Sequence, residues 1–264
     1  MKRVLLVFII ILAVGSVAAG KIYWEKKISA QASSATKTST AAPPVQESEK
    51  NVFDEKNRLK SANNLPKETA AKFAKAIKEK KPLTFMVGSD TTEGTQKTWP
   101  ALFKEELLKV YSDQVVKVDL ELYKDKTTKD ILTEKIDQKL SMKKPDILLI
   151  EPFILKDNGV VGISNTLSNT ERILNSFKQE NKDISIFIQP SYPMYKAKYY
   201  PKEVTKVAQF SKDQGIPFLN HWEKWPNDQS KEMLSFLNSN KSAPSEKGNQ
   251  VWLQYLNHYF AGEN

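Results

Sequence analysis

Few residues in this chain of 264 could carry acid–base or nucleophilic chemistry. The sequence has no cysteine and two histidines, His221 and His258. The missing thiols exclude a disulfide framework, a thiolate zinc site and a cysteine nucleophile, and two histidines argue against a multi-histidine metal centre. We therefore expect no metal and no cofactor. Any histidine-dependent step must use one of these two side chains, and His258 falls near the apolar stripe of the last expected helix, as a core-edge residue does.

The other candidates follow short apolar runs in which buried strands are expected. These candidates are Ser89, Asp90, Glu151, Asp157, Asn158 and His221. In a parallel sheet, ligands bind at the carboxyl ends of the strands. We therefore expect Ser89, Asn158 and His221 to converge at one edge of a sheet. Tyrosines in the segment PSYPMYKAKYYP (190–201) could add an aromatic wall there, or could pack that loop onto the sheet.

The elements that must position these residues alternate between strand and helix patterns. Apolar runs predict five strands, at 83–88, 115–123, 146–150, 184–189 and 217–219. Apolar residues at helical spacing predict helices at 99–111, 127–140, 167–177, 203–214 and 251–260. This alternation predicts an α/β fold of three layers, α/β/α, with a five-stranded parallel sheet of the flavodoxin-like kind.

The amino end has the pattern of an export signal. Lys2 and Arg3 precede an uninterrupted apolar run from Val4 to Val14. Residues 1–27 could be a signal peptide, cleaved after small residues such as Ala19, or an uncleaved anchor helix. In both cases we expect the rest of the chain outside the cytoplasm, secreted or held at the cell membrane by a single pass.

Composition divides the remainder into three parts. Residues 28–50 are rich in Ser, Thr, Ala and Pro and predict a flexible linker, and 51–81 read as a helical stalk or packing segment before a domain at 82–264. With 40% hydrophobic residues, the chain is too apolar to be disordered throughout and too polar for several membrane spans. Its net charge of +9 comes from interspersed lysines and glutamates, which indicates a solvated surface rather than a nucleic-acid groove.

Three segments carry a family resemblance. VGSDTTEG (87–94), DILLIEPFILKDNG (146–159) and APSEKGNQVWLQYL (243–256) resemble the sequence blocks of SGNH (GDSL-type) hydrolases. The resemblance implies their fold, a serine nucleophile and an oxyanion contact from Asn158. It spans about 83–260 and agrees with the expected order of strands and helices.

Every block departs from the family pattern. Family members use the order Gly-Asp-Ser, whereas this chain has Gly88-Ser89-Asp90, so a strict match places Asp90 at the nucleophile position. A shift of one residue would let Ser89 serve. Ala243 stands where the catalytic histidine is expected and Asn240 where its aspartate partner is expected. The block that normally supplies a glycine backbone donor is Lys-Asp-Lys at 124–126.

Two functions follow. The first is an exported ester hydrolase (esterase or deacetylase) acting on acyl esters or glycans of the cell envelope, with Ser89 as nucleophile, His221 as base and Asn158 in the oxyanion hole. Asp90, Asp157 and Glu151 are weaker alternatives for catalysis. The second is a catalytically silent relative that binds an envelope glycan or protein partner. In that case His221 would pack beside Trp222 and Trp225 and hydrogen-bond to a loop carbonyl.

Overall fold

The computed structural model describes residues 55–90 and 98–262 of the 264. The expected signal or anchor segment at 1–27 and the linker at 28–50 lie outside these residues. Within the described ranges, no helix is long and apolar enough to cross a membrane.

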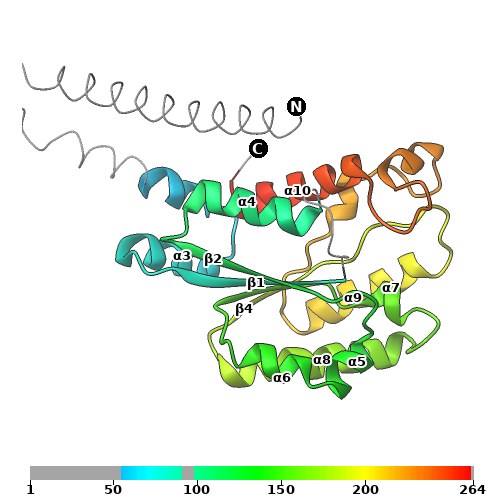
Figure 1. The fold of residues 1–264 in the computed structure, drawn as a ribbon, viewed down its shortest axis with the longest axis horizontal. Helices are drawn as coiled ribbons and strands as arrows, with labels where there is room; N and C mark the ends of the chain where they lie inside the picture. The colour runs from blue at the N-terminus through cyan, green and yellow to red at the C-terminus, as the bar shows by residue number, and fades with distance from the viewer. Residues whose placement is uncertain (1–54, 91–97, 263–264) are drawn as a thin grey trace, which may run out of the picture. The chain divides into compact units, whose positions relative to one another are not determined.

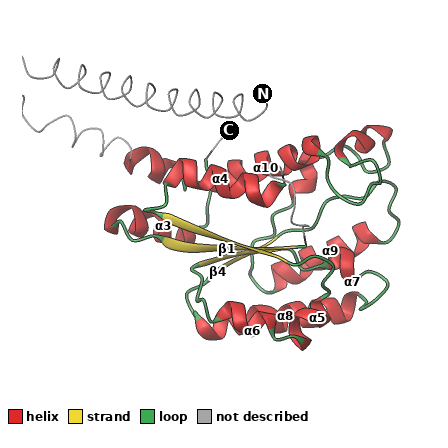
Figure 2. Ribbon diagram, viewed as in Figure 1, coloured by secondary structure: helices red, strands yellow, loops and turns green. Residues whose placement is uncertain are grey.

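Four parallel strands form the sheet, in the order β2-β1-β3-β4. The strands are β1 (Leu83–Ser89), β2 (Val116–Leu122), β3 (Ile147–Ile150) and β4 (Ser185–Ile188). Helices cover both faces of the sheet (Figure 1), and Figure 2 shows the strands as the middle layer. The expected three-layer α/β/α architecture with a parallel sheet is confirmed.

The expected fifth strand is wrong as a full strand. Residues 217–219 make one bridge, in which Phe218 pairs with Ile188. Pro217 has no N–H to donate, and the chain turns into the 3-10 helix η1 (His221–Lys224) two residues after Leu219. Pairing beside β4 is therefore confined to a single position.

One layer consists of the helices α3 (Lys67–Glu79), α4 (Trp99–Tyr111) and α10 (Glu246–Phe260), with the 3-10 helix η2 (Lys231–Phe236) nearby. Its core is strongly aromatic. The rings of Phe85, Phe103 and Phe260 meet edge to face at centroid distances of 5.2 to 5.6 Å. These contacts join α4 and α10 to β1, the strand that carries Ser89.

The other layer contains α5 (Thr128–Thr133), α6 (Ile136–Ser141), α7 (Ile154–Asp157), α8 (Ile163–Glu180) and α9 (Tyr200–Asp213). The single helix expected at 127–140 is two helices. Lys135 adopts a left-handed φ of 54° between them, which ends α5 and starts α6 in a new direction. The break lets Ile131 and Leu140 face the same core cluster.

The segment before β1 belongs to the core. Residues 55–61 are helical, and α3 buries Phe73 and Ile77 in the cluster beneath α4 and α10. Ala62 and Leu65, in the turn before α3, are buried in the same cluster. The described part of 51–81 is therefore packed into the domain.

Candidate functional site

A row of buried polar side chains crosses the carboxyl edge of the sheet. Ser89 ends β1, Glu151 and Gln189 directly follow β3 and β4, and His221 comes two residues after Leu219. Side chains two apart in a strand point to the same face, and the residues two before these four are all buried in the α4/α10 cluster: Val87, Leu149, Phe187 and Leu219. The four polar side chains therefore lie at the carboxyl edge of the sheet, on the face that α4 and α10 cover. Each is at most 1% exposed.

The hydroxyl of Ser89 is hydrogen-bonded to a carboxyl group. Its Oγ donates a hydrogen bond to Glu151 Oε1 at 2.6 Å. The serine is fully buried, at 0% exposure. This hydrogen bond joins the carboxyl ends of β1 and β3, and the role of Ser89 as a nucleophile stays a prediction.

Asp90 and Glu151 form a buried pair of carboxyl groups at the centre of the site. Burial raises the pKa of Glu151 well above its ordinary value, and the neighbouring Asp90 raises it further. Burial also raises the pKa of Asp90, although Lys156 partly opposes this shift. Two adjacent buried carboxyls retain a proton more readily than isolated ones. The pair can both donate and accept hydrogen bonds, and Asp90, at 8% exposure, is its more accessible member.

Lys156 places a positive charge beside this pair. It lies in the short helix α7, and its Nζ is 2.9 Å from Asp125 Oδ1. Asp125 belongs to the Lys-Asp-Lys segment that occupies the expected glycine block. Lys156 is not among the site residues expected from the sequence. The signal was present, because Lys156 directly precedes Asp157 in the segment that resembles the third hydrolase block.

Both ring nitrogens of His221 form hydrogen bonds with residues other than Ser89. Its Nε2 donates to the carbonyl oxygen of Pro190 at 2.9 Å, and its Nδ1 accepts from Trp225 Nε1 at 3.0 Å. The ring also stacks on Trp252, with centroids 3.9 Å apart and planes at 12°. Complete burial lowers the pKa of His221 to about 3, so the ring is neutral.

These contacts leave neither imidazole nitrogen for a proton transfer from Ser89. The structure places Ser89 and His221 on the same face at the same edge, but the expected nucleophile–base hydrogen bond between them is not formed. The histidine makes the contacts of the structural alternative, with a loop carbonyl and Trp225. His258 lies in α10, and its backbone carbonyl accepts from Asn64 Nδ2 at 2.6 Å.

Asp157 is the last residue of the one-turn helix α7, and Asn158 directly follows it. Asn158 caps the end of α7 and is exposed. Asp157 is buried and accepts hydrogen bonds from the Thr128 backbone N–H at 2.9 Å and from the Thr166 hydroxyl at 2.7 Å. The aspartate thus ties α5 and α8 to α7. The structure therefore gives Asp157 an architectural position and leaves the oxyanion role of Asn158 as a prediction.

The position of the usual catalytic histidine is a tight turn. Ala243 accepts a backbone hydrogen bond from Asn238 at 2.9 Å, and Pro244 forms an antiparallel bridge with Leu237. Asn240 Oδ1 accepts from the hydroxyl of Ser242 at 2.7 Å. The turn keeps its place before α10 but contains no histidine and no carboxylate.

Gln189 is a second site residue that is not among those expected from the sequence. Its Oε1 accepts from Trp252 Nε1 at 3.0 Å, so the indole is fixed under the histidine ring. Trp252 also stacks on Trp99, with centroids 4.7 Å apart. The position of Gln189 directly after a buried strand was a usable signal. Its partner on α10, 63 residues away, was not visible in the sequence.

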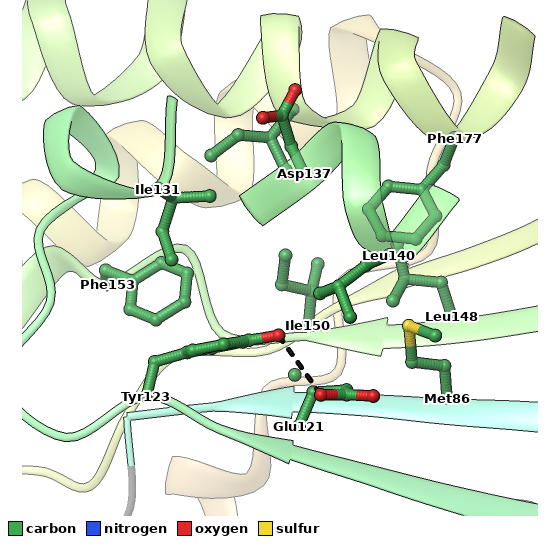
Figure 3. A pocket seen from close by; sticks show the side chains of 12 residues that line it. Met86, Glu121, Tyr123, Ile131, Asp137, Leu140, Leu148, Ile150, Phe153 and Phe177 are labelled. Atoms are coloured by element: carbon green, nitrogen blue, oxygen red, sulfur yellow. Dashed lines mark hydrogen bonds between the residues drawn. The ribbon is translucent and has the colours of Figure 1, made fainter. Parts of the chain in front are cut away.

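A cavity lies on the opposite face of the sheet and is separate from this row. Figure 3 shows it between the sheet and α5, α6 and α8, lined by apolar side chains that include Met86, Leu140 and Phe177. The hydroxyl of Tyr123 donates to Glu121 Oε2 at 3.3 Å at its side. The space available to the centre of a water molecule is about 20 Å³, enough for about one water. It is a packing gap rather than a substrate site. The described residues contain no group of three His, Cys, Asp or Glu side chains that could hold a metal.

Comparisons with known proteins agree with this architecture. No protein-family model and no curated protein matches the chain. Solved structures do match. A lipolytic protein of the G-D-S-L family from Desulfitobacterium hafniense has a TM-score of 0.55 at 14% identity, over 67% of this chain and 98% of that one.

Two carbohydrate-directed enzymes match to a similar degree. A carbohydrate esterase of family 3 from Talaromyces cellulolyticus has a TM-score of 0.57 at 15% identity, over 67% of this chain and 95% of that one. An acetylxylan esterase from Geobacillus stearothermophilus has a TM-score of 0.56 at 13% identity, over 69% and 95%. Together with the parallel sheet and its carboxyl-edge site, these matches show that the chain has an SGNH (GDSL-type) hydrolase-like fold.

Proposed function

We propose that this chain is a catalytically silent protein with a hydrolase-like fold, which binds a carbohydrate of the cell envelope at the carboxyl edge of its sheet. The observation that carries the proposal is the engagement of His221 by Pro190 and Trp225. A serine hydroxyl without a base remains protonated and unreactive at neutral pH. The resemblance supports the same conclusion, because it aligns Asp90 with the nucleophile and Ala243 with the usual histidine.

The residues present at this edge suit the binding of hydroxyl groups. Burial raises the pKa of both Asp90 and Glu151, which favours a bound proton that the pair can donate, and Lys156 supplies a further donor beside them. Tyr192, half-buried beside these carboxyls, contributes an apolar face next to polar groups. This combination of planar apolar surface and paired donors and acceptors is what a sugar ring requires. Two of the structural neighbours are esterases that act on carbohydrates, which agrees with this ligand class.

Export is the second part of the proposal. The basic and then apolar amino end predicts that the domain is presented outside the cytoplasm, tethered by residues 28–50. A ligand of the cell envelope would be within reach of such a tether. Protease treatment of intact cells should cut the linker if this orientation holds.

Ester hydrolysis is the competing function, and one observation favours it. The Ser89 hydroxyl donates to a carboxyl group whose raised pKa gives it some capacity to accept a proton. Hydrolysis would require Ser89 to become exposed. The two functions differ in what they predict for a single substitution, Ser89→Ala.

The test uses the purified full chain, a small activated acetate ester and an array of neutral, acetylated and charged oligosaccharides. We expect no turnover above the uncatalysed rate and no difference between the parent and Ser89→Ala. We also expect oligosaccharide binding that Asp90→Asn weakens by about tenfold, the scale of one hydrogen bond to a charged group. Asp113→Asn, an exposed aspartate after α4, is the matched control and should bind like the parent.

Two other outcomes would each contradict one part of the proposal. Turnover that Ser89→Ala abolishes would establish the hydrolase. A folded chain that retains no oligosaccharide on the array would remove the carbohydrate proposal, with folding checked by thermal unfolding.

A further inference from the structure

Two lysines converge on the ring of Tyr195, three residues after the Tyr192 that lies beside the Asp90–Glu151 pair. The Nζ atoms of Lys196 and Lys241 lie 5.3 and 5.5 Å from the ring centroid of Tyr195. The two ammonium groups are therefore no more than about 11 Å apart, although their residues are distant in the sequence. We call Tyr195, Lys196 and Lys241 the lysine–tyrosine patch.

The charge of this patch is not neutralised by the protein. Among the described residues, no carboxylate lies within 4.0 Å of either ammonium group. A third cation, Lys247, lies 4.1 Å from the ring centroid of Phe236 in the neighbouring 3-10 helix η2. At a separation of up to about 11 Å, near the Debye length of roughly 8 Å at physiological ionic strength, salt screens the repulsion between the two ammonium groups only in part. An anion bound between the two lysines would relieve this repulsion.

Backbone hydrogen bonds anchor the main chain at both lysines. Lys196 donates its N–H to Asp228 O at 3.0 Å, and Lys241 donates its N–H to Asn238 O at 2.9 Å. The first lysine follows β4 through the loop that contains Ser191 and Tyr192, and the second lies two residues before Ala243. Figure 1 shows the loops after β4 and before α10 on the same side of the molecule. Tyr195 itself is packed partly against the α4/α10 cluster, which makes it a fixed platform.

We propose that the lysine–tyrosine patch binds a phosphate group carried by the carbohydrate ligand, so that this inference rests on the proposed function and names its ligand class. Lysine ammonium groups are point charges that bind phosphate oxygens without a fixed angular requirement. Two unpaired cations on one aromatic ring match the double charge of a phosphate monoester better than the single charge of a carboxylate. The bound sugar would lie between this patch and the Asp90–Glu151 pair.

The test compares the affinity of the full chain for glucose, glucose 6-phosphate and glucuronate by isothermal titration calorimetry at two salt concentrations. We expect glucose 6-phosphate to bind at least tenfold more tightly than the other two. The double variant Lys196→Gln/Lys241→Gln should lose this gain and its salt dependence. The control Lys202→Gln/Lys212→Gln removes two exposed charges from α9 and should change the affinity less than twofold.

The outcomes separate this inference from the proposed function. Equal losses in both double variants would show a net-charge effect and overturn the patch, and glucuronate binding as tight as that of the phosphate sugar would overturn the phosphate assignment. If Asp90→Asn weakens glucose binding while phosphate adds nothing, the proposed function stands and this inference fails. Inorganic phosphate is titrated in the same way: if it binds through the patch but no sugar binds at all, the patch stands and the carbohydrate function fails.

Discussion

At the residue scale, surroundings rather than residue type decide what a side chain can do here. His221 stands where a base for Ser89 was expected, and the strand pattern was sufficient to place both residues at one edge. The pattern could not show that Trp225 and Pro190 would occupy both ring nitrogens. Those contacts depend on how η1 and the loop after β4 fold back, which no local spacing encodes. The same holds for Ser89: its position at the end of a strand could be predicted from the sequence, and its complete burial could not.

The buried neutral state of His221 predicts a specific pH dependence of stability. Its pKa is about 3 in the folded chain, against 6.5 as its ordinary value, so the unfolded chain binds more protons between these limits. The free energy of unfolding should therefore fall as the pH drops below about 6.5, by up to about 1.4 kcal/mol per pH unit from this group. Asp90 and Glu151 have raised pKa values in the folded chain, so their contribution to the free energy of unfolding is lost as the pH rises.

The variant His221→Gln isolates this contribution. Glutamine can still donate to Pro190 and accept from Trp225, but it does not titrate, and the two carboxyls and His258 remain in both proteins. Urea unfolding at pH 7 and pH 4.5 should show a smaller loss of stability at the lower pH in the variant than in the parent. An equal loss in both proteins would mean that His221 is protonated or exposed in the native state.

At the element scale, turns and breaks escaped prediction more often than the elements themselves. The helix at 99–111 and the strand at 146–150 were predicted nearly to their ends, because their apolar periodicity is strong. The break at Lys135 was not, since a lysine in a left-handed conformation has no sequence signature. The apolar run at 217–219 predicts a strand, whereas the structure has a single bridge at Phe218, because an apolar run does not show where backbone pairing stops.

The first turn of α10 provides a test at this scale. Gly248 donates its backbone N–H to the hydroxyl of the cap residue Ser245 at 3.3 Å. A Cβ at this glycine would lie 2.3 Å from the carbonyl oxygen of Phe236 and 2.9 Å from Trp225 Cη2. Gly248→Ala should therefore destabilise the fold by about 1–3 kcal/mol through overpacking, although alanine favours a helix by about 1 kcal/mol.

Denaturant unfolding of Gly248→Ala beside Gln250→Ala, an exposed position in the same helix, separates packing from helix propensity. The control should change stability by less than about 0.5 kcal/mol. A gain in stability for both variants would contradict the close contact between α10 and η2. Because Trp225 also donates to His221, a shift of its ring would disturb the site as well.

At the scale of the whole molecule, the layered architecture followed from the sequence, which left open whether 51–81 is a stalk or packs on the domain. Alternating apolar runs and amphipathic helices leave few options besides a parallel sheet covered on both faces. The lysine- and glutamate-rich composition of 51–81 hid how much of it is buried. Phe73 and Ile77 are 0% and 3% exposed, in the cluster that also holds Trp252.

This packing predicts that the segment before β1 contributes directly to the stability of the domain. The ring of Phe73 lies 4.5 Å from that of Tyr111, centroid to centroid, and Tyr111 donates to the carbonyl oxygen of Phe260 at 2.7 Å. Phe73→Ala in the full chain should therefore lower the free energy of unfolding by about 3–5 kcal/mol, as expected for a large buried ring. Leu59→Ala, at a position 42% exposed in the same segment, should cost less than about 1 kcal/mol. Unfolding followed by tryptophan fluorescence reports on this core because Trp99 and Trp252 lie within it. Equal, small effects of the two substitutions would show instead that 51–81 behaves as a stalk and that the domain is held together from β1 onward.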